Sequence, residues 1–351
     1  MMKRMPWLVP VLVVAVVAVG VWWFVFHESK DEKGNRLIAA ASAAMKAGNL
    51  TSAEADLSKA LALQPNNGVL LHNLGVLYLR QKRLPEARAA FQRAAAADGP
   101  QANQVHAEEL LQLAQISYAE KNWPRAASEL EQAIAVDSQR SMLHTRLLDL
   151  QLGRMNDHVA ADSTASRFLR VCGRTARNYE DLAFVYYQNN EYASSSQLAQ
   201  RAAALEDTAY SAYSLAARAM WRLDHVAQGL EYIDAALRRH PSAVPLLVTK
   251  GLLLIEGNHR DAALAVSDQA LRLAPRDYSV HQLRQKVFAS FGQLDKALEE
   301  VDIARELTQD PDEQRILLRQ QRTLEGLLAA TRRGASAGAS AAGADSSGAK
   351  P

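Results

Sequence analysis

Residues 68–100 read GVLLHNLGVLYLRQKRLPEARAAFQRAAAADGP, and this stretch decides the fold. Gly75 in its first half has no side chain, and Ala87 and Ala94 in its second half lie seven residues apart. Two small residues with that spacing share one face of a helix, two turns from each other, so another helix can approach closely there. The stretch is therefore predicted to form two helices that pack against each other.

The small residue at Ala87 belongs to a series that runs along most of the chain. Its members are separated by 34, 39, 35, 34, 34, 34 and 34 residues. They are Ala53, Ala87, Ala126, Ala161, Ser195, Gly229, Ala263 and Ala297. A fixed period of about 20 to 50 residues indicates a repeat array. The series predicts eight helix pairs, in repeats 34–67, 68–101, 107–140, 142–175, 176–209, 210–243, 244–277 and 278–311.

These repeats resemble the tetratricopeptide repeat family. The second repeat matches the family pattern W-L-G-Y…A…F…A at Leu71, Leu74, Gly75, Tyr78, Ala87, Phe91 and Ala94. The resemblance implies an all-α fold, a right-handed α-solenoid in which each repeat contributes a helix A and a helix B. Repeats 142–175 and 278–311 depart from the pattern and are interpreted as degenerate, and the extra residues 102–106 and Ser141 interrupt the period.

The N-terminal region carries a candidate membrane anchor. Residues 7–26, WLVPVLVVAVVAVGVWWFVF, contain no charged side chain and are long enough to cross the hydrocarbon layer as one helix. We expect an uncleaved anchor, preceded by a short basic N-terminus (1–6) and followed by a polar linker (27–33). The alternative is a secretory signal that is cleaved after residues 1–20, although no A-x-A site follows the apolar core.

The orientation of this anchor is less strongly indicated, because Lys and Arg flank the apolar segment on both sides. Residues 1–6 are basic without any acidic residue, whereas the other flank mixes both charges. We therefore expect a single-pass protein of the bacterial inner membrane with its remaining chain in the periplasm. The cytoplasmic face of that membrane is the alternative.

The region after the array divides into two segments. Residues 312–333 are predicted to form one amphipathic helix that caps the array, because the last repeat of a solenoid otherwise exposes an apolar face. Residues 334–351 are mostly Gly, Ala and Ser, which can bury too little surface to order a chain. This last segment is expected to be a disordered tail.

Composition and motifs argue against several classes of function. The formal net charge of +2 over 351 residues gives no basic footprint for nucleic acid. Cys172 is the single cysteine, so the chain can build neither a disulfide framework nor a CxxC metal site. The sequence also lacks HExxH, GxSxG, GxxxxGK[ST] and GxGxxG motifs. We predict a non-enzyme without catalytic residues, cofactor, metal or an evident small-molecule substrate.

By its resemblance to the family, the chain is expected to bind partners in a concave groove lined by the A helices. The family's groove positions give a set rich in aromatic residues and arginine: Tyr118, Arg146, Phe184, Tyr187, Arg218, Trp221 and Arg222. These residue types most often dominate the binding energy at protein interfaces. The alternative is that these side chains only pack against neighbouring helices.

Together these features predict a membrane-anchored, non-enzymatic scaffold or adaptor in a bacterial cell-envelope assembly or secretion complex. Its partner is expected to be a protein, held in the groove as an extended peptide or a helix. A cytoplasm-facing regulatory scaffold and a non-catalytic subunit of a membrane enzyme complex are the two alternatives.

Overall fold

The computed structural model describes residues 30–97 and 102–345, and within these ranges the chain is entirely helical, with seventeen α-helices, one π-helix and no strand. This confirms the predicted all-α class. The predicted basic N-terminus, the anchor at 7–26 and residues 27–29 lie outside the described ranges. Among the described helices, none is both long and apolar enough to cross a membrane.

The described residues divide into two compact bodies on either side of the boundary between Thr164 and Ala165, which we call the N-terminal body and the C-terminal body. Helix α9 (His158–Val171) crosses the boundary between them. The other described helices of the N-terminal body are α2 (Lys30–Lys46), α3 (Leu50–Leu63), α4 (Gly68–Arg80), α5 (Leu84–Ala95), α6 (Ala102–Ala119), α7 (Trp123–Val136), α8 (Ser141–Leu150) and the π-helix η1 (Gln151–Met155). Helix α2 thus begins inside the segment 27–33 that the sequence predicted as a linker, and α6 takes in the extra residues 102–106.

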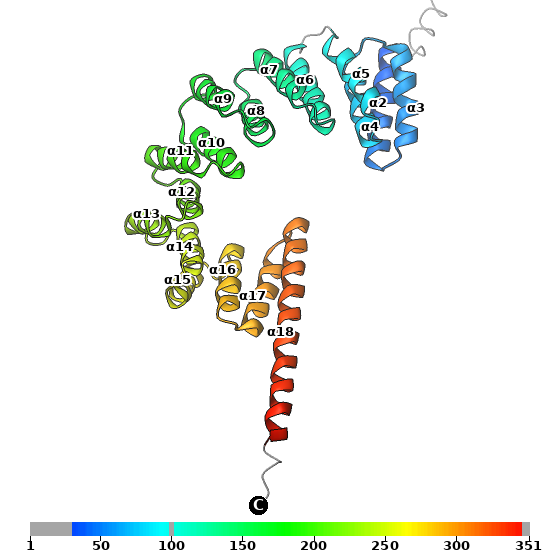
Figure 1. Cartoon of the computed structure of the whole chain (residues 1–351). Helices are drawn as coiled ribbons and strands as arrows, with labels where there is room; N and C mark the ends of the chain where they lie inside the picture. The colour runs from blue at the N-terminus through cyan, green and yellow to red at the C-terminus, as the bar shows by residue number, and fades with distance from the viewer. Residues whose placement is uncertain (1–29, 98–101, 346–351) are drawn as a thin grey trace, which may run out of the picture. The chain divides into compact units, whose positions relative to one another are not determined.

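The C-terminal body continues the same alternation of helices. Its members are α10 (Ala176–Gln188), α11 (Tyr192–Leu205), α12 (Tyr210–Arg222), α13 (Val226–Arg239), α14 (Val244–Glu256), α15 (Arg260–Leu273), α16 (Tyr278–Ser290), α17 (Leu294–Leu307) and α18 (Pro311–Asp345). Within each body a helix packs against its partner in the same repeat and against the next repeat, as α5 does with α4 and α6 (Figure 1). Such nearest-neighbour packing defines a solenoid.

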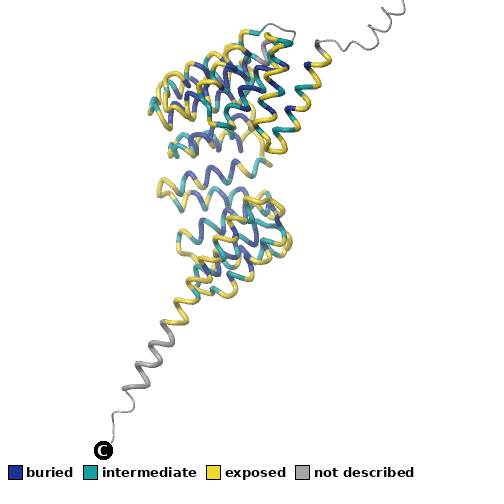
Figure 2. The backbone as a smooth tube through the Cα atoms, turned by 90° about the vertical axis from the view of Figure 1, so that its right-hand side faces the viewer, coloured by how far each residue is buried: buried dark blue, intermediate teal, exposed yellow. Residues whose placement is uncertain are grey.

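The series of small residues forms the contact between helices A and B. All eight positions are buried; Ala53 and Ala87, for example, are fully inaccessible (Figure 2). A Cβ atom on Gly75 would lie 2.4 Å from the ring of Phe91, and one on Gly229 would lie 2.9 Å from the carbonyl oxygen of Ala217. Only a residue of minimal size fits where two helices approach this closely.

A residue with positive φ ends helix A in every repeat, at the fifteenth position. The eight residues have φ between 53° and 78°: Gly48, Lys82, Lys121, Asn156, Asn190, Asp224, Asn258 and Gly292. A left-handed residue after a helix lets its N–H groups bond to the last carbonyl oxygens, as Asn190 N does to Tyr187 O at 3.1 Å. Most of these residues are not glycine, so the turn geometry is set by the packing of the two helices that it joins.

The repeat 142–175 accommodates its extra residue inside helix A. Up to Leu150 the buried positions follow a repeat that starts at 141, because Leu143, Leu147 and Leu150 are buried as Leu70, Leu74 and Leu77 are. The π-helix η1 then takes up one residue and restores the period before α9. The predicted boundary is therefore wrong by one residue for helix A of this repeat, since the sequence cannot show where an insertion is absorbed.

The C-terminal helix α18 is longer than the sequence predicted. It packs on α17 through the buried side chains of Leu317 and Leu324, in the place expected for a cap. It continues to Asp345, so residues 334–345 are helical, where a disordered tail was expected. Alanine occupies six of these twelve positions and has the highest helix propensity, and extending an existing helix costs far less than starting one.

Candidate functional site

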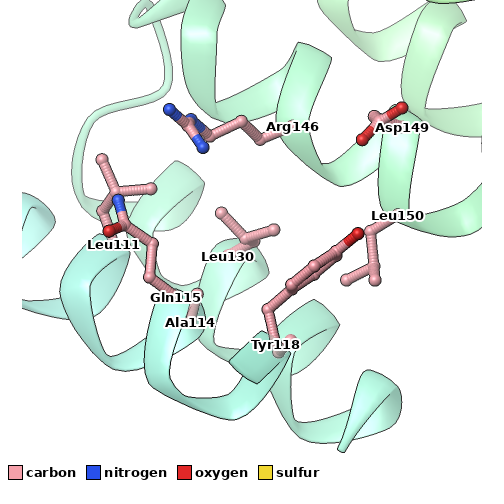
Figure 3. Close-up of a pocket in the computed structure, with 9 residues that line it drawn as sticks. Leu111, Ala114, Gln115, Tyr118, Leu130, Arg146, Asp149 and Leu150 are labelled. Atoms are coloured by element: carbon pink, nitrogen blue, oxygen red, sulfur yellow. The ribbon is translucent and has the colours of Figure 1, made fainter. Parts of the chain in front are cut away.

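A pocket opens between α6, α7 and α8 in the N-terminal body, and two predicted groove residues lie at its mouth (Figure 3). Its volume is about 300 Å³. Aliphatic side chains form the floor: Leu111, Ala114, Ala126, Leu130 and Leu150. Polar side chains are confined to the rim: Gln115, Tyr118, Arg146 and Asp149. The structure thus brings Tyr118 and Arg146 together, across a repeat boundary.

Tyr118 is fixed in place by an aromatic and cationic cluster at one end of the pocket. Its ring packs edge to face on Trp123, with centroids 5.0 Å apart. The Arg154 guanidinium lies 5.6 Å from the centre of the Tyr118 ring and its Nε donates to the Tyr118 hydroxyl at 2.8 Å. We call Tyr118, Trp123 and Arg154 the N-terminal corner. The hydrogen bond to the Tyr118 hydroxyl raises the pKa of Arg154, so this side chain remains charged.

Arg146 differs from Arg154 because it makes no hydrogen bond or ion pair with another described residue. It is exposed on α8, on the opposite side of the pocket from Asp149 (Figure 3). A guanidinium in this state has all five of its N–H donors available to a carboxylate.

The C-terminal body carries a second corner, made of Tyr187, Tyr192 and Arg222. The two tyrosine rings meet edge to face at 5.4 Å. Arg222 lies 4.9 Å from the centre of the Tyr192 ring, and its Nη2 donates to the Tyr192 hydroxyl at 2.6 Å. That hydroxyl in turn donates to the side-chain oxygen of Asn190 at 2.6 Å.

The remaining predicted residues lie around this C-terminal corner. Arg218 is exposed, with its guanidinium 5.2 Å from the centre of the Tyr187 ring and no hydrogen bond or ion pair to another described residue. Trp221 is half-buried against the hydrophobic core and lies 5.8 Å from the Arg222 guanidinium. Phe184, three residues before Tyr187 on α10, is 52% exposed. Side chains of the type that dominates interfaces are therefore accessible here, while Trp221 serves packing as well.

Sequence reasoning missed Trp123, Arg154 and Tyr192, although the repeat positions carry a signal for them. In both corners an aromatic residue at position 12 meets another at position 17, and the arginine comes from position 13 of the next repeat. Position 17 starts helix B, where the family pattern predicts only helix packing. The recurrence of this arrangement across two repeats is the signal that identifies it.

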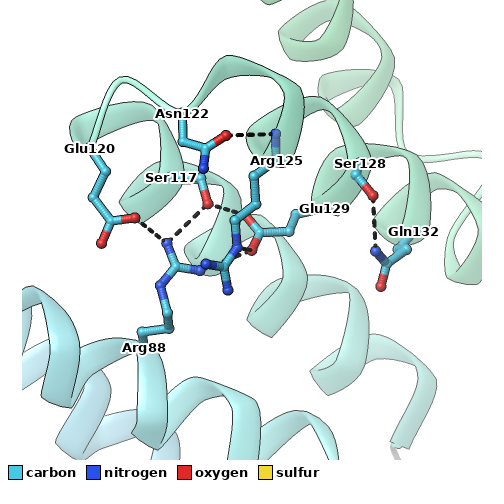
Figure 4. A network of polar contacts seen from close by, with 8 residues as sticks. All are labelled: Arg88, Ser117, Glu120, Asn122, Arg125, Ser128, Glu129 and Gln132. Atoms are coloured by element: carbon cyan, nitrogen blue, oxygen red, sulfur yellow. Dashed lines mark hydrogen bonds and ion pairs between the residues drawn. The ribbon is translucent and has the colours of Figure 1, made fainter.

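A buried polar network supports the helices that carry the pocket (Figure 4). Arg88 on α5 donates to Glu129 at 3.0 Å, to Glu120 at 2.7 Å and to the hydroxyl of Ser117 at 3.0 Å. Ser117 donates to the other oxygen of Glu129 at 2.5 Å, and Arg125 Nε reaches Glu129 at 3.1 Å. Ser117 and Glu129 are buried, so this network fixes α6 and α7 against the preceding repeat.

A second buried contact joins the same two repeats. The Nδ1 atom of His72 lies 2.7 Å from Glu109, whose carboxylate is fully buried. The hydrogen bond that the His72 ring donates to the Glu109 carboxylate raises the pKa of His72, against the effect of burial. His72 occupies an A-helix position that faces partners in the family's pattern, but here it contacts the next repeat.

Within the described ranges, no three His, Cys, Asp or Glu side chains come together in a way that could hold a metal ion. Cys172 is half-buried, directly follows α9 and is not part of a disulfide. The pocket and the two corners are the places where the predicted groove residues gather.

Two protein-family models match separate stretches of the chain, and one curated protein is related to part of it. Residues 38–103 match the sequence model of the tetratricopeptide repeat, and residues 176–305 match that of the ChAPs, the Chs5p-Arf1p-binding proteins. A curated relative, cellulose synthase operon protein C of Xanthomonas axonopodis pv. citri, is 28% identical over 166 residues, which cover 46% of this chain and 11% of that protein. The chain therefore spans about a tenth of the length of this relative.

Solved structures of similar fold include two bacterial examples. The C-terminal part of a tetratricopeptide repeat protein from Cytophaga hutchinsonii is 16% identical, with 70% of this chain and 98% of that chain covered and a TM-score of 0.47. A tetratricopeptide repeat protein from Parabacteroides merdae is also 16% identical, with 73% and 99% covered and a TM-score of 0.43. Residues 38–103 are therefore tetratricopeptide repeats by their sequence, and the succession of helix pairs with small residues at their contacts continues the same architecture along the other described repeats.

Proposed function

We propose that this chain is a non-enzymatic adaptor that binds segments of other proteins on the faces of its A helices. The observation that carries the proposal is the accessibility of two guanidinium groups that have no described ion-pair partner, Arg218 beside the Tyr187 ring and Arg146 on the rim of the pocket that Tyr118 also lines. Aromatic residues and arginine contribute the largest share of binding energy at interfaces. A carboxylate of the partner can accept two parallel hydrogen bonds from each guanidinium.

The adaptor is anchored in the bacterial inner membrane by residues 7–26, with its repeats in the periplasm. The uncharged, apolar character of these twenty residues supports the anchor, and the acid-free basic N-terminus supports the orientation. Fusion of alkaline phosphatase or a cytoplasm-dependent fluorescent protein to the C-terminus separates the two orientations. A reporter active only in the cytoplasm would favour the cytoplasm-facing regulatory scaffold.

The complex served by this adaptor belongs to cell-envelope assembly or secretion. Pilus assembly, secretion machines and exported polysaccharide are all compatible with an anchored adaptor. The similarity to a protein named for a cellulose synthase operon supports exported polysaccharide among them. A non-catalytic subunit of a membrane enzyme complex, the second alternative, would copurify with its catalytic partner in a fixed ratio.

The test of the binding surface is a substitution of Arg218→Ala together with Trp221→Ala, followed by purification from membranes and mass spectrometry of bound proteins. We expect native partners to be lost, because both side chains contribute accessible area at the C-terminal corner. The matched control is Arg201→Ala with Leu205→Ala, two exposed residues on α11. Unchanged recovery of partners with native helix content would reject the proposal for this surface.

A further inference from the structure

We infer that the pocket at Tyr118 and Arg146 binds one large apolar side chain of an extended protein segment, while Arg146 pairs with an acidic residue next to that side chain. The inference rests on the proposed function and specifies the partner's chemistry at one site. It is argued from the volume of the pocket, its lining and the charges at its mouth.

The volume fits a single side chain better than a cofactor. About 300 Å³ corresponds to roughly ten molecules of liquid water and is the lower limit of ordinary small-molecule sites. The floor holds only aliphatic side chains, whereas a cofactor site needs several convergent polar groups at depth. The occupant must therefore be apolar where it enters.

The charges at the mouth determine which residue flanks this apolar group. Arg146 and Gln115 lie on one side of the pocket and Asp149 on the other (Figure 3). A carboxylate beside Arg146 gains a charge-assisted hydrogen bond, whereas the charge of Asp149 already interacts with that of Arg154. The acidic residue of the segment therefore lies on the Arg146 side of the pocket.

The π-helix supplies an independent observation at the same place. Because η1 takes up the extra residue after Leu150, Arg146 and Asp149 occupy the sixth and ninth positions of a helix A that starts at 141. None of the other seven repeats has arginine at its sixth position. After η1 the period is restored, which leaves Arg154 stacked on Tyr118 at the pocket's end. π-bulges are concentrated at functional sites, and this one lies beside the pocket.

The test is selection from a random nonapeptide library displayed on phage, using the purified full-length chain and its variants. Peptides enriched on the native protein should share a large aliphatic or aromatic residue within two positions of Asp or Glu. Peptides selected on the Arg146→Glu variant should carry Lys or Arg in place of the acidic residue and should keep the apolar residue. This is expected because the substitution changes only the charge at the mouth of the pocket. A native-selected peptide, labelled and measured by fluorescence anisotropy, should bind Arg146→Glu at least about tenfold more weakly.

Two variants complete the design. Lys59→Glu makes the same charge change on an exposed residue of α3 in the same body and should leave the selected peptides unchanged. Arg218→Ala with Trp221→Ala removes side chains of the other proposed surface, and the peptides whose binding Arg146→Glu weakens should bind this variant as they bind the native chain. If every enriched peptide loses binding to this second variant and none to Arg146→Glu, the pocket inference is overturned and the proposed function stands. Absence of enrichment, or enriched peptides without an apolar residue, would overturn the inference as well.

Discussion

The buried network around Arg88 makes a quantitative prediction for Arg88→Met. Methionine keeps much of the volume of the side chain but removes its hydrogen bonds to Glu129, Ser117 and Glu120. Breaking a buried ion pair costs about 3–5 kcal/mol when the remaining charge has no other partner. Arg125 still reaches Glu129 at 3.1 Å, so we expect a smaller loss of about 2–3 kcal/mol.

Hydrogen exchange followed by mass spectrometry is the appropriate assay, because solenoids open locally and a single global unfolding energy describes them poorly. A loss of about 2–3 kcal/mol corresponds to exchange about 30 to 150 times faster. The increase should be confined to peptides from α5, α6 and α7. Peptides from α14 to α17 serve as the internal reference.

The double variant Arg88→Met with Glu129→Met distinguishes a paired charge from simple loss of packing. With both charges removed, no buried carboxylate is left unpaired, since Glu120 is partly exposed to solvent, and the double variant should exchange more slowly than Arg88→Met alone. The reasoning would be refuted by an Arg88→Met variant whose α6 and α7 amides exchange less than about three times faster, since this corresponds to under about 1 kcal/mol. It would also be refuted by a double variant in which the effects simply add.

Three further predictions concern the repeats. Gly75→Ala should lower the free energy of local opening of α4 and α5 by about 1–3 kcal/mol, measured by hydrogen exchange, because its Cβ meets the Phe91 ring. Lys121→Gly should raise that of α6 and α7 by about 0.5–1 kcal/mol, since glycine adopts the φ of 59° without strain. The raised pKa of His72 means that the stabilising contribution of its protonation is complete below 6.5 and is lost as the pH rises through the folded-state pKa. The difference in opening free energy between the native chain and His72→Gln should therefore decrease as the pH rises, and a difference that does not change with pH would contradict this.

The features that could be predicted from the sequence are those that recur at every repeat. A helix pair needs a small residue where its two helices touch. A small residue therefore recurs at the same position of every repeat, as at Ala53, Ala87 and Ala126. The period thus predicted the succession of helices and their pairing. It could not predict the left-handed turns at Lys82 and Lys121, because those residues have no intrinsic preference for positive φ.

The candidate site was predictable only in part, for a different reason. Tyr118 and Arg218 were found because their positions follow from the repeat register, whereas Arg146 was selected from a register that is one residue out for helix A of its repeat. The network from Arg88 to Glu129 spans 41 residues and depends on side-chain reach between neighbouring repeats, which no local pattern encodes. Likewise, the burial of His72 against Glu109 appears only when the two repeats are packed together.

The pocket lies beside helix A of the repeat 142–175, the repeat in which an extra residue interrupts the 34-residue period. The two corners use equivalent repeat positions, so each follows from the repeat itself and contributes a similar aromatic and cationic surface in its own body. The pocket has a second requirement, because Arg146 and Asp149 reach its mouth from a helix A that begins one residue early and is extended by η1. Deleting one residue from η1, for example Gly153, would convert this repeat to regular length and place Arg154 at the thirteenth position of a helix A that starts at 141, the position that Arg222 holds in the C-terminal corner. Arg154 should therefore remain over Tyr118 after the deletion, because the π-helix absorbs the extra residue without changing the register that follows it. The corner thus depends on the repeat position alone, and the pocket is distinguished by the arginine at the sixth position, which no other repeat carries.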